Sequence, residues 1–334
     1  MESGTNIRQK MIRPTLSYTF KKNFQGFLSC LIILILLTNH NNVKGMNKTD
    51  DLSRRLLKLY PVDIVKQSFG KKGYQKELIR DVVSSKSTND ILDFAHDSLD
   101  YTKQHIYIFS FDKPFKEKGL DRKKIPISLH SEESIIDGVK FNCFSKVEYD
   151  VINIEEKSYT EEKLYFLQPI SITANEKHLI VQFTKLEKDI GSFFTKSIKA
   201  FTKSQKNHET EIIPQLKDYF NAHCKLTVCD LNKGIKAIWD ADIVDAKQPS
   251  WKDDYSTDTK TMDEDYTFKS KYPVQYKAML RAPLYKTVFK YIKPDNAFVT
   301  RFTIDPLKGF ISTSVQSKTN KQISNVITSI LSNN

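Results

Sequence analysis

The feature that most constrains the fold of this chain is a change in hydrophobic period near residue 104. Between residues 50 and 100, leucine, isoleucine and valine recur three or four positions apart, which is typical of amphipathic helices. From His105 onward the period falls to two, beginning with the dense apolar run Ile106–Phe109. This order predicts a mixed α+β protein with an N-terminal helical module, an antiparallel β-rich middle and an α/β C-terminal region.

The length of 334 residues is enough for two ordinary domains, or for one domain with an appended module. We interpret residues 1–45 as a hydrophobic leader and 46–103 as the helical module. A β-rich domain is expected over 104–190, and an α/β C-terminal domain over 191–334.

Four helices are expected in the helical module. The first spans Asp51–Leu59, and the second is opened by Pro61 at a favoured first-turn position. After a Gly-Lys-Lys-Gly turn at 70–73, the third helix covers Tyr74–Val83. Ser87 precedes Asp90 by three residues, the spacing of a capping box, and so predicts the start of the fourth helix.

The alternating segments that follow predict an antiparallel sheet or partial barrel, with Asp137-Gly138 as a hairpin turn. The expected strands are Ile106–Phe109, Ile125–Leu129, Val139–Phe144, Lys146–Ile154, Lys163–Thr173 and Leu179–Leu186.

The C-terminal region mixes helical and alternating patterns. Helical character is expected across 190–222 in two stretches, the second with Pro214 in its first turn. The acidic residues 240–265 look least structured. Further helices are expected at Gly234–Trp239, Tyr272–Leu280, Leu284–Ile292 and Lys321–Leu331, with strands at Lys225–Val228, Phe298–Ile304 and Phe310–Val315.

The leader contains the apolar run Phe27–Leu37, which is shorter than the roughly 20 apolar residues of a membrane-spanning helix. Three interpretations stay open: a secretory signal, a short membrane anchor, or an upstream extension caused by a wrong start codon, with Met46 as the true start. We favour the third and therefore expect a cytoplasmic protein. Export or anchoring through 27–37 is the alternative, and membrane contact is expected only if residues 1–45 are translated and retained.

Cysteine usage and charge add to this picture. Four cysteines at irregular spacing, one of them inside the apolar run, do not suggest a disulfide framework and fit a reducing compartment. The formal net charge is +12, of which the leader carries +5. A moderate positive balance favours anionic partners such as nucleic acid or anionic lipid, although solubility alone is the simpler explanation.

The first candidate site is the helical hairpin Val62–Val83, with its Gly/Lys turn. This layout resembles the SAP motif, a small helical hairpin used in DNA binding, although Val62, Ile64, Val65 and Phe69 replace its usual leucine-rich first helix. The resemblance covers about 22 residues and implies that the cations of the hairpin contact phosphates. Those residues are Lys71, Lys72, Lys76 and Arg80. Solvated lysines on an ordinary hairpin are the competing interpretation.

The second candidate is the basic and aromatic stretch Tyr266–Lys293, which contains no acidic residue. Cations with interleaved aromatic rings suit single-stranded nucleic acid, in which bases stack and phosphates pair with Lys or Arg. The proposed cations are Lys269, Lys271, Lys277, Arg281, Lys286 and Lys290. The competing interpretation is that the rings belong to the core and the lysines to the wet face of two helices.

Metal and catalytic sites receive little support from the sequence. The acidic residues from Asp240 to Asp265 fail the EF-hand pattern, and His223, Cys224 and Cys229 have no second ligand pair at zinc spacing, so we expect no metal and no cofactor. The chain also lacks G-x-S-x-G, H-E-x-x-H, P-loop and G-x-G-x-x-G motifs. This argues against an enzyme without excluding one whose catalytic residues are scattered.

The sequence therefore predicts a protein that associates with DNA or RNA through phosphate contacts of little sequence specificity. Two alternatives stay open: a protein-interaction or scaffold module without catalysis, which would have a protein partner, and a metal-dependent enzyme with dispersed carboxylates.

Overall fold

The computed structural model describes residues 48–334, apart from segments 156–157, 187–198, 207–208, 253–256 and 260–264. The described residues belong to one compact unit. The leader and its apolar run lie outside them. In the part of the chain that is described, no helix is long and apolar enough to cross a membrane.

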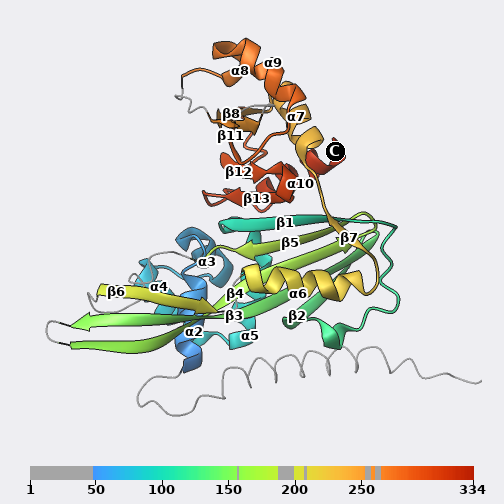
Figure 1. Ribbon diagram of the computed structural model, residues 1–334. Helices are drawn as coiled ribbons and strands as arrows, with labels where there is room; N and C mark the ends of the chain where they lie inside the picture. Colours follow the sequence, from blue (N-terminus) through green and yellow to red (C-terminus); the bar gives the residue numbers. More distant parts are fainter. Residues whose placement is uncertain (1–47, 156–157, 187–198, 207–208, 253–256, 260–264) are drawn as a thin grey trace, which may run out of the picture. The chain divides into compact units, whose positions relative to one another are not determined.

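The predicted mixed α+β class is confirmed (Figure 1). The strands are β1 (Gln104–Phe111), β2 (Ser128–Ile135), β3 (Gly138–Glu155), β4 (Ser158–Asn175), β5 (His178–Thr184), β6 (Lys199–Lys206), β7 (Leu226–Val228), β8 (Val244–Gln248), β9 (Ser250–Lys252), β10 (Thr257–Thr259), β11 (Thr287–Tyr291), β12 (Arg301–Asp305) and β13 (Phe310–Thr313). The helices are α2 (Lys48–Leu57), α3 (Val62–Phe69), α4 (Gln75–Ser85), α5 (Thr88–Asp97), α6 (Glu209–Asn221), α7 (Asn232–Asp240), α8 (Phe268–Lys271), α9 (Pro273–Arg281) and α10 (Gln322–Ser332).

One antiparallel sheet joins strands from the β-rich and C-terminal segments. Among the described residues its order is β2-β3-β4-β5-β1-β13-β12-β11-β8, with β6 also pairing β3 and β7 also pairing β1. Strand β1 therefore connects the two halves, because it pairs β5 on one side and β13 on the other. The sheet crosses residue 190, and the domain division expected there stays a prediction.

The alternation along β1 sends its side chains into two different cores. Ile106 and Ile108 are fully buried in a cluster with residues of α7, α8, α9 and α10. Tyr107 and Phe109 belong to the opposite cluster, which contains apolar residues of α6. Because successive side chains of a strand point to opposite faces, one strand supports both layers.

The β3–β4 hairpin is the longest pairing in the sheet. The two strands predicted at Val139–Phe144 and Lys146–Ile154 form the single strand β3, which pairs β4 along its whole length. On its other edge, β2 pairs the first part of β3 and β6 pairs the second part (Figure 1). The hairpin turn between β2 and β3 lies at residues 136–137, one residue earlier than the predicted Asp137-Gly138. Ile135 and Gly138 pair on its two sides, and Asp137 takes a positive φ of 60°.

The four helices of the N-terminal module are confirmed as α2 to α5, and α2 and α5 pack against β4. Arg55 of α2 donates to the carbonyl of Tyr165 at 2.8 Å, and its guanidinium lies over the Phe166 ring. The capping box of Ser87 and Asp90 is present in both directions. Pro61 is the N-cap of α3, one residue outside the first turn that the sequence suggested.

The helix predicted at Leu284–Ile292 is wrong, because this segment contains strand β11. Its helical spacing of Tyr285, Phe289 and Ile292 is outweighed by an alternation in which Thr287, Phe289 and Tyr291 are buried. Pairing with β12 on one side and β8 on the other holds the segment extended. Lys286 therefore lies immediately before β11 and Lys290 lies within it, rather than both on a helix.

Three other places also differ from the sequence interpretation. Residues 199–206 form strand β6 rather than helix, because the exposed edge of β3 pairs them; residues 190–198 lie outside the described part. The acidic region near 240–265 contains strands β8, β9 and β10. Pro214 lies inside α6 instead of in its first turn. The helices at α7, α9 and α10, strand β7 and the β12–β13 hairpin agree with the prediction.

Candidate functional site

We define the basic hairpin as α3, α4 and the turn between them. Three of its four predicted cations are exposed and the fourth is partly exposed. Helix α3 ends at Gly70 in the left-handed conformation, with φ 61°. The chain then turns through Lys71, which is partly exposed, and Lys72, which is exposed. Lys76 and Arg80 lie one turn apart on α4 and are both exposed.

Acidic neighbours are present on the same hairpin and reduce its net charge. Arg80 Nε lies 3.5 Å from the carboxylate of Asp81, but both side chains are at least half exposed, so this ion pair adds little stability. Burial lowers the pKa of Lys58, the residue that follows helix α2, and the neighbouring cations Arg55 and Lys76 lower it further against the opposing effect of Asp51.

Tyr74 is the residue of this hairpin that the sequence interpretation did not use. Its side chain is 85% exposed although tyrosine is a large and partly apolar residue. It occupies the N-cap position of α4 and makes no side-chain hydrogen bond to the described residues of that helix. Tyr74 therefore follows Lys72 and precedes Lys76 in the chain, at the positive end of the α4 dipole.

The second predicted set of cations is divided among several elements. On helix α8, Lys269 pairs with Asp242 at 3.2 Å, and Lys271 lies over the Tyr266 ring. Lys277 and Arg281 are exposed on α9. Lys286 is exposed immediately before β11, and Lys290 is partly buried on it.

Most aromatic rings of that second stretch belong to the core. Phe268, Tyr276, Phe289 and Tyr291 are buried, whereas Tyr266 is well exposed. The Tyr276 hydroxyl donates to Asp240 at 2.7 Å, which fixes its ring in place. The stacking surface that the sequence suggested at 266–293 is therefore largely unavailable to bases.

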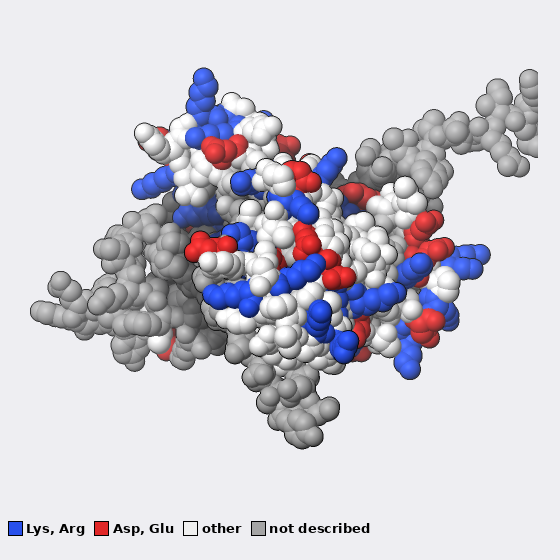
Figure 2. All heavy atoms as spheres, turned by 90° about the horizontal axis from the view of Figure 1, so that it is seen from above, with Lys and Arg blue, Asp and Glu red and all other residues white. Residues whose placement is uncertain are grey.

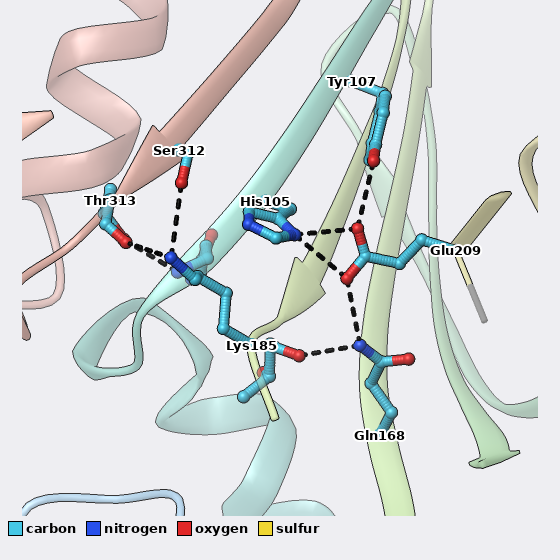
Figure 3. Close-up of polar contacts among 9 residues, drawn as sticks. His105, Tyr107, Gln168, Lys185, Glu209, Ser312 and Thr313 are labelled. Atoms are coloured by element: carbon cyan, nitrogen blue, oxygen red, sulfur yellow. Dashed lines mark hydrogen bonds and ion pairs between the residues drawn. The ribbon is translucent and has the colours of Figure 1, made fainter. Parts of the chain in front are cut away.

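A buried carboxylate forms a second, unpredicted site. Glu209 is 3% exposed and lies at the start of α6, where the helix dipole favours a negative charge. It faces His105 Nδ1 at 2.9 and 3.1 Å and accepts from the Tyr107 hydroxyl at 3.1 Å and from Gln168 Nε2 at 3.3 Å (Figure 3). Three donors from two strands thus converge on one acidic side chain.

The surroundings of Glu209 explain why it tolerates burial. Gln168 Nε2 also donates to the carbonyl of Thr184 at 2.8 Å, so the amide is held in one orientation. Burial raises the pKa of Tyr107 well above its ordinary value, and the Glu209 charge raises it further, so the phenol stays a donor. Burial also raises the pKa of Tyr149 to about 12, again with a contribution from Glu209.

One weak signal of this cluster is present in the sequence, but it identifies only the residues of one strand. His105 and Tyr107 are polar residues at alternating positions of a strand that is otherwise strongly apolar. Glu209 lies 104 residues further along the chain from His105. Only the packing of α6 against β1 brings them together.

The acidic residues considered as metal ligands are engaged in separate contacts. Asp242 pairs with Lys269, whereas the buried Asp245 pairs with Lys247 at 3.1 Å and accepts from the Phe268 amide at 2.9 Å. Among residues that the structure describes, no group of three or more His, Cys, Asp or Glu side chains could hold a metal ion.

The three ligands considered near residue 224 also point to different partners. Cys224 Sγ donates to Asp112 Oδ1 and to the Lys113 carbonyl, both at 3.2 Å. Cys229 Sγ accepts from Asn334 Nδ2 at 3.7 Å, and His223 is exposed. Both sulfurs are therefore part of the protein's own packing.

The distribution of charge on the surface is mixed. On the face shown in Figure 2, Lys and Arg side chains lie among Asp and Glu side chains and form no single continuous basic surface within the described part. On that face the basic side chains therefore form local groups among acidic ones. Comparison of the chain with protein-family models, with curated proteins and with solved structures finds no match.

Proposed function

We propose that the protein associates with nucleic acid through the basic hairpin, by phosphate contacts of little sequence specificity. The observation that carries the proposal is the exposed ring of Tyr74, which has the exposed cations Lys72 and Lys76 two residues before and after it in the chain. An exposed aromatic ring beside cations suits a nucleotide, whose base can stack while its phosphate pairs with Lys or Arg.

Each group of the hairpin has a separate role in this proposal. Lys71, Lys72, Lys76 and Arg80 contact phosphates, which fixes the backbone of the nucleic acid without reading its sequence. The amides at the N-terminus of α4 favour an anion at the same place. Tyr74 stacks on an unpaired base, so single strands gain an additional contact that duplexes lack.

The C-terminal cations supplement this contact. Lys277, Arg281 and Lys286 are exposed and extend the phosphate-binding surface. Lys269, Lys271 and Lys290 contribute less, because each already has an interaction within the protein.

Binding of the full-length chain to fluorescent single- and double-stranded DNA and RNA across a salt series tests the proposal. A variant with Gln at positions 71, 72, 76 and 80 should bind more weakly. Its slope of log affinity against log salt should be smaller by about 3, since each lost phosphate contact removes roughly 0.7 to 0.9 from the slope.

A charge-matched control separates this site from general electrostatic attraction. Four exposed lysines of another loop, Lys113, Lys116, Lys118 and Lys123, are changed to Gln in the control. Equal losses in the two variants would refute a site at the hairpin. Absence of binding at low salt would refute the function itself and leave a protein-interaction module.

Tyr74→Ala tests the stacking contact separately. It should weaken single-strand binding by about 1–3 kcal/mol and leave duplex binding nearly unchanged. Tyr266→Ala, which removes the other exposed tyrosine of the predicted sites, is the matched control and should have a smaller effect. Equal effects of Tyr74→Ala on both nucleic-acid forms would contradict stacking.

We also propose a cytoplasmic location. Its support is that the described cysteines, Cys143, Cys224 and Cys229, are buried free thiols, as is usual in a reducing compartment. Fractionation of cells that express the full-length chain with a C-terminal tag tests this, and recovery in the membrane or exported fraction would refute it.

A further inference from the structure

The Glu209 contact leaves His105 with a defined basic nitrogen. Because Nδ1 faces both carboxylate oxygens, at 2.9 and 3.1 Å, the proton of a neutral imidazole sits on Nδ1 and Nε2 carries the lone pair. The His105 side chain is 28% exposed, so this base is accessible, whereas Glu209 is not. Figure 3 shows the ring lying between Glu209 on one side and Ser312 with Lys185 on the other.

The strand register places a hydroxyl-bearing residue opposite the residue that carries this base. Ser312 of β13 is opposite His105 of β1. The amide of Ile108 donates to the Gly309 carbonyl at 2.8 Å, and the alternation of an antiparallel ladder then makes His105 and Ser312 a non-hydrogen-bonded pair. In such a pair the Cα atoms are about 4.5 Å apart and both side chains lie on the same face.

A cation and an apolar ring complete the surroundings of Ser312. Lys185 Nζ lies 3.4 Å from Ser312 Oγ and 3.4 Å from the Thr313 carbonyl. An ammonium at this place would stabilise negative charge that develops next to the hydroxyl. Phe310, which is partly exposed, packs its ring against those of His105 and Tyr107 and offers an apolar wall.

We propose that Ser312, His105 and Glu209 form a nucleophile, base and carboxylate set that hydrolyses small carboxylic esters. Ser312 Oγ attacks the ester carbonyl carbon and forms a C–O bond, while His105 Nε2 accepts the hydroxyl proton. The tetrahedral intermediate breaks its bond to the alcohol oxygen, and the alcohol leaves with the proton from His105. Water then cleaves the acyl-serine by the same route, which releases the carboxylic acid and restores Ser312.

The remaining groups act around these steps. Glu209 is a positioning residue that holds the imidazole tautomer and stabilises the imidazolium formed during attack. Lys185 Nζ, 3.4 Å from Ser312 Oγ, is close enough to the nucleophile to stabilise the ester oxyanion. An ester suits the set because its alcohol needs one proton to leave. Among the described residues, Lys185 is the cation bonded to Ser312, which differs from the cluster of positive charge that phosphoryl transfer uses.

The direct test is covalent labelling of the full-length chain with a fluorophosphonate probe, followed by mass spectrometry of its peptides. The expected result is an adduct on Ser312 that is lost in Ser312→Ala and formed at least tenfold more slowly in His105→Ala. Ser314→Ala, an exposed serine just beyond β13, is the matched control and should label like the parent. The proposal would be overturned if Ser312 stays unlabelled in the folded protein. Equal labelling of another serine in Ser312→Ala and His105→Ala would also overturn it.

Hydrolysis of p-nitrophenyl acetate separates positioning from folding. Glu209→Gln should lower kcat at least tenfold while KM changes less than twofold, and Glu209→Asp should recover part of the loss. A structural role alone would lower the active fraction, as read from thermal unfolding, and would not leave this pattern. If Glu209→Gln does not fold, the comparison of His105→Ala with Ser314→Ala in the same assay decides the proposal.

Discussion

Acidification should destabilise this protein through one buried histidine, His96 of α5. The side chain is 7% exposed, and neither ring nitrogen has a hydrogen-bond partner among the described residues. Its ring packs edge-on against Phe144 at 4.5 Å and stacks on His130 at 5.7 Å. Burial, together with smaller contributions from the nearby His130 and Lys140, lowers the pKa of His96 from the ordinary 6.5 to about 3.

The direction and size of the effect follow from proton linkage. Below pH 6.5 the unfolded chain binds a proton at His96 that the folded protein excludes, so stability is fully present above pH 6.5 and falls with pH until about pH 3. One pH unit of this difference is worth about 1.4 kcal/mol. At pH 5 the group should therefore cost about 2 kcal/mol of the free energy of unfolding, which is a large part of the stability of an ordinary domain.

Urea unfolding of the full-length chain at pH 8 and pH 5 measures this cost. His96→Leu removes the titrating group at similar volume, so its loss of stability between the two pH values should be about 2 kcal/mol smaller than that of the parent. His223→Gln, at an exposed histidine, is the matched control and should follow the parent. Parallel pH dependence of the parent and His96→Leu would refute the reasoning.

Three further substitutions test the packing, each by urea or thermal unfolding. Gly234→Ala should destabilise by about 1–3 kcal/mol, because its Cβ would lie 2.0 Å from the Ile330 carbonyl oxygen and force α7 away from α10; a neutral result would contradict this close approach. Ser87→Ala should cost about 1 kcal/mol through loss of the α5 cap, and an unchanged midpoint would mean that the capping box is dispensable. Tyr60→Phe removes a buried hydroxyl that donates to the Ala95 carbonyl at 2.7 Å and should cost about 1–2 kcal/mol, whereas a gain in stability would argue against that bond.

The sequence by itself determined the elements whose signals are local. The helices of residues 48–97 follow from apolar spacing, glycine turns and a capping box, all of which act within a few residues. Strands β1, β4 and β5, and the extended character of β3, follow in the same way from their period of two, whereas the strand predicted at Ile125–Leu129 overlaps β2 only at Ser128 and Leu129. The exposure of Lys72, Lys76 and Arg80 also follows, because they occupy the polar side of an amphipathic hairpin.

Only the tertiary structure decided the segments whose partners are distant. Residues 287–291 carry spacings compatible with both helix and strand, and the neighbouring strands β8 and β12 select the strand. Residues 199–206 likewise become a strand because β3 offers an unpaired edge far away in the sequence. In both places long-range hydrogen bonding outweighs local propensity.

The same distinction applies to the candidate sites. A basic turn can be recognised from adjacent residues, but the exposure of Tyr74 and the burial of the aromatic rings near 266–293 depend on packing that no local pattern encodes. The Glu209 cluster depends on it entirely. His105, Gln168, Glu209 and Ser312 come from three strands and one helix, and the contacts between them exist only because sheet register and helix packing bring distant residues within a few ångströms.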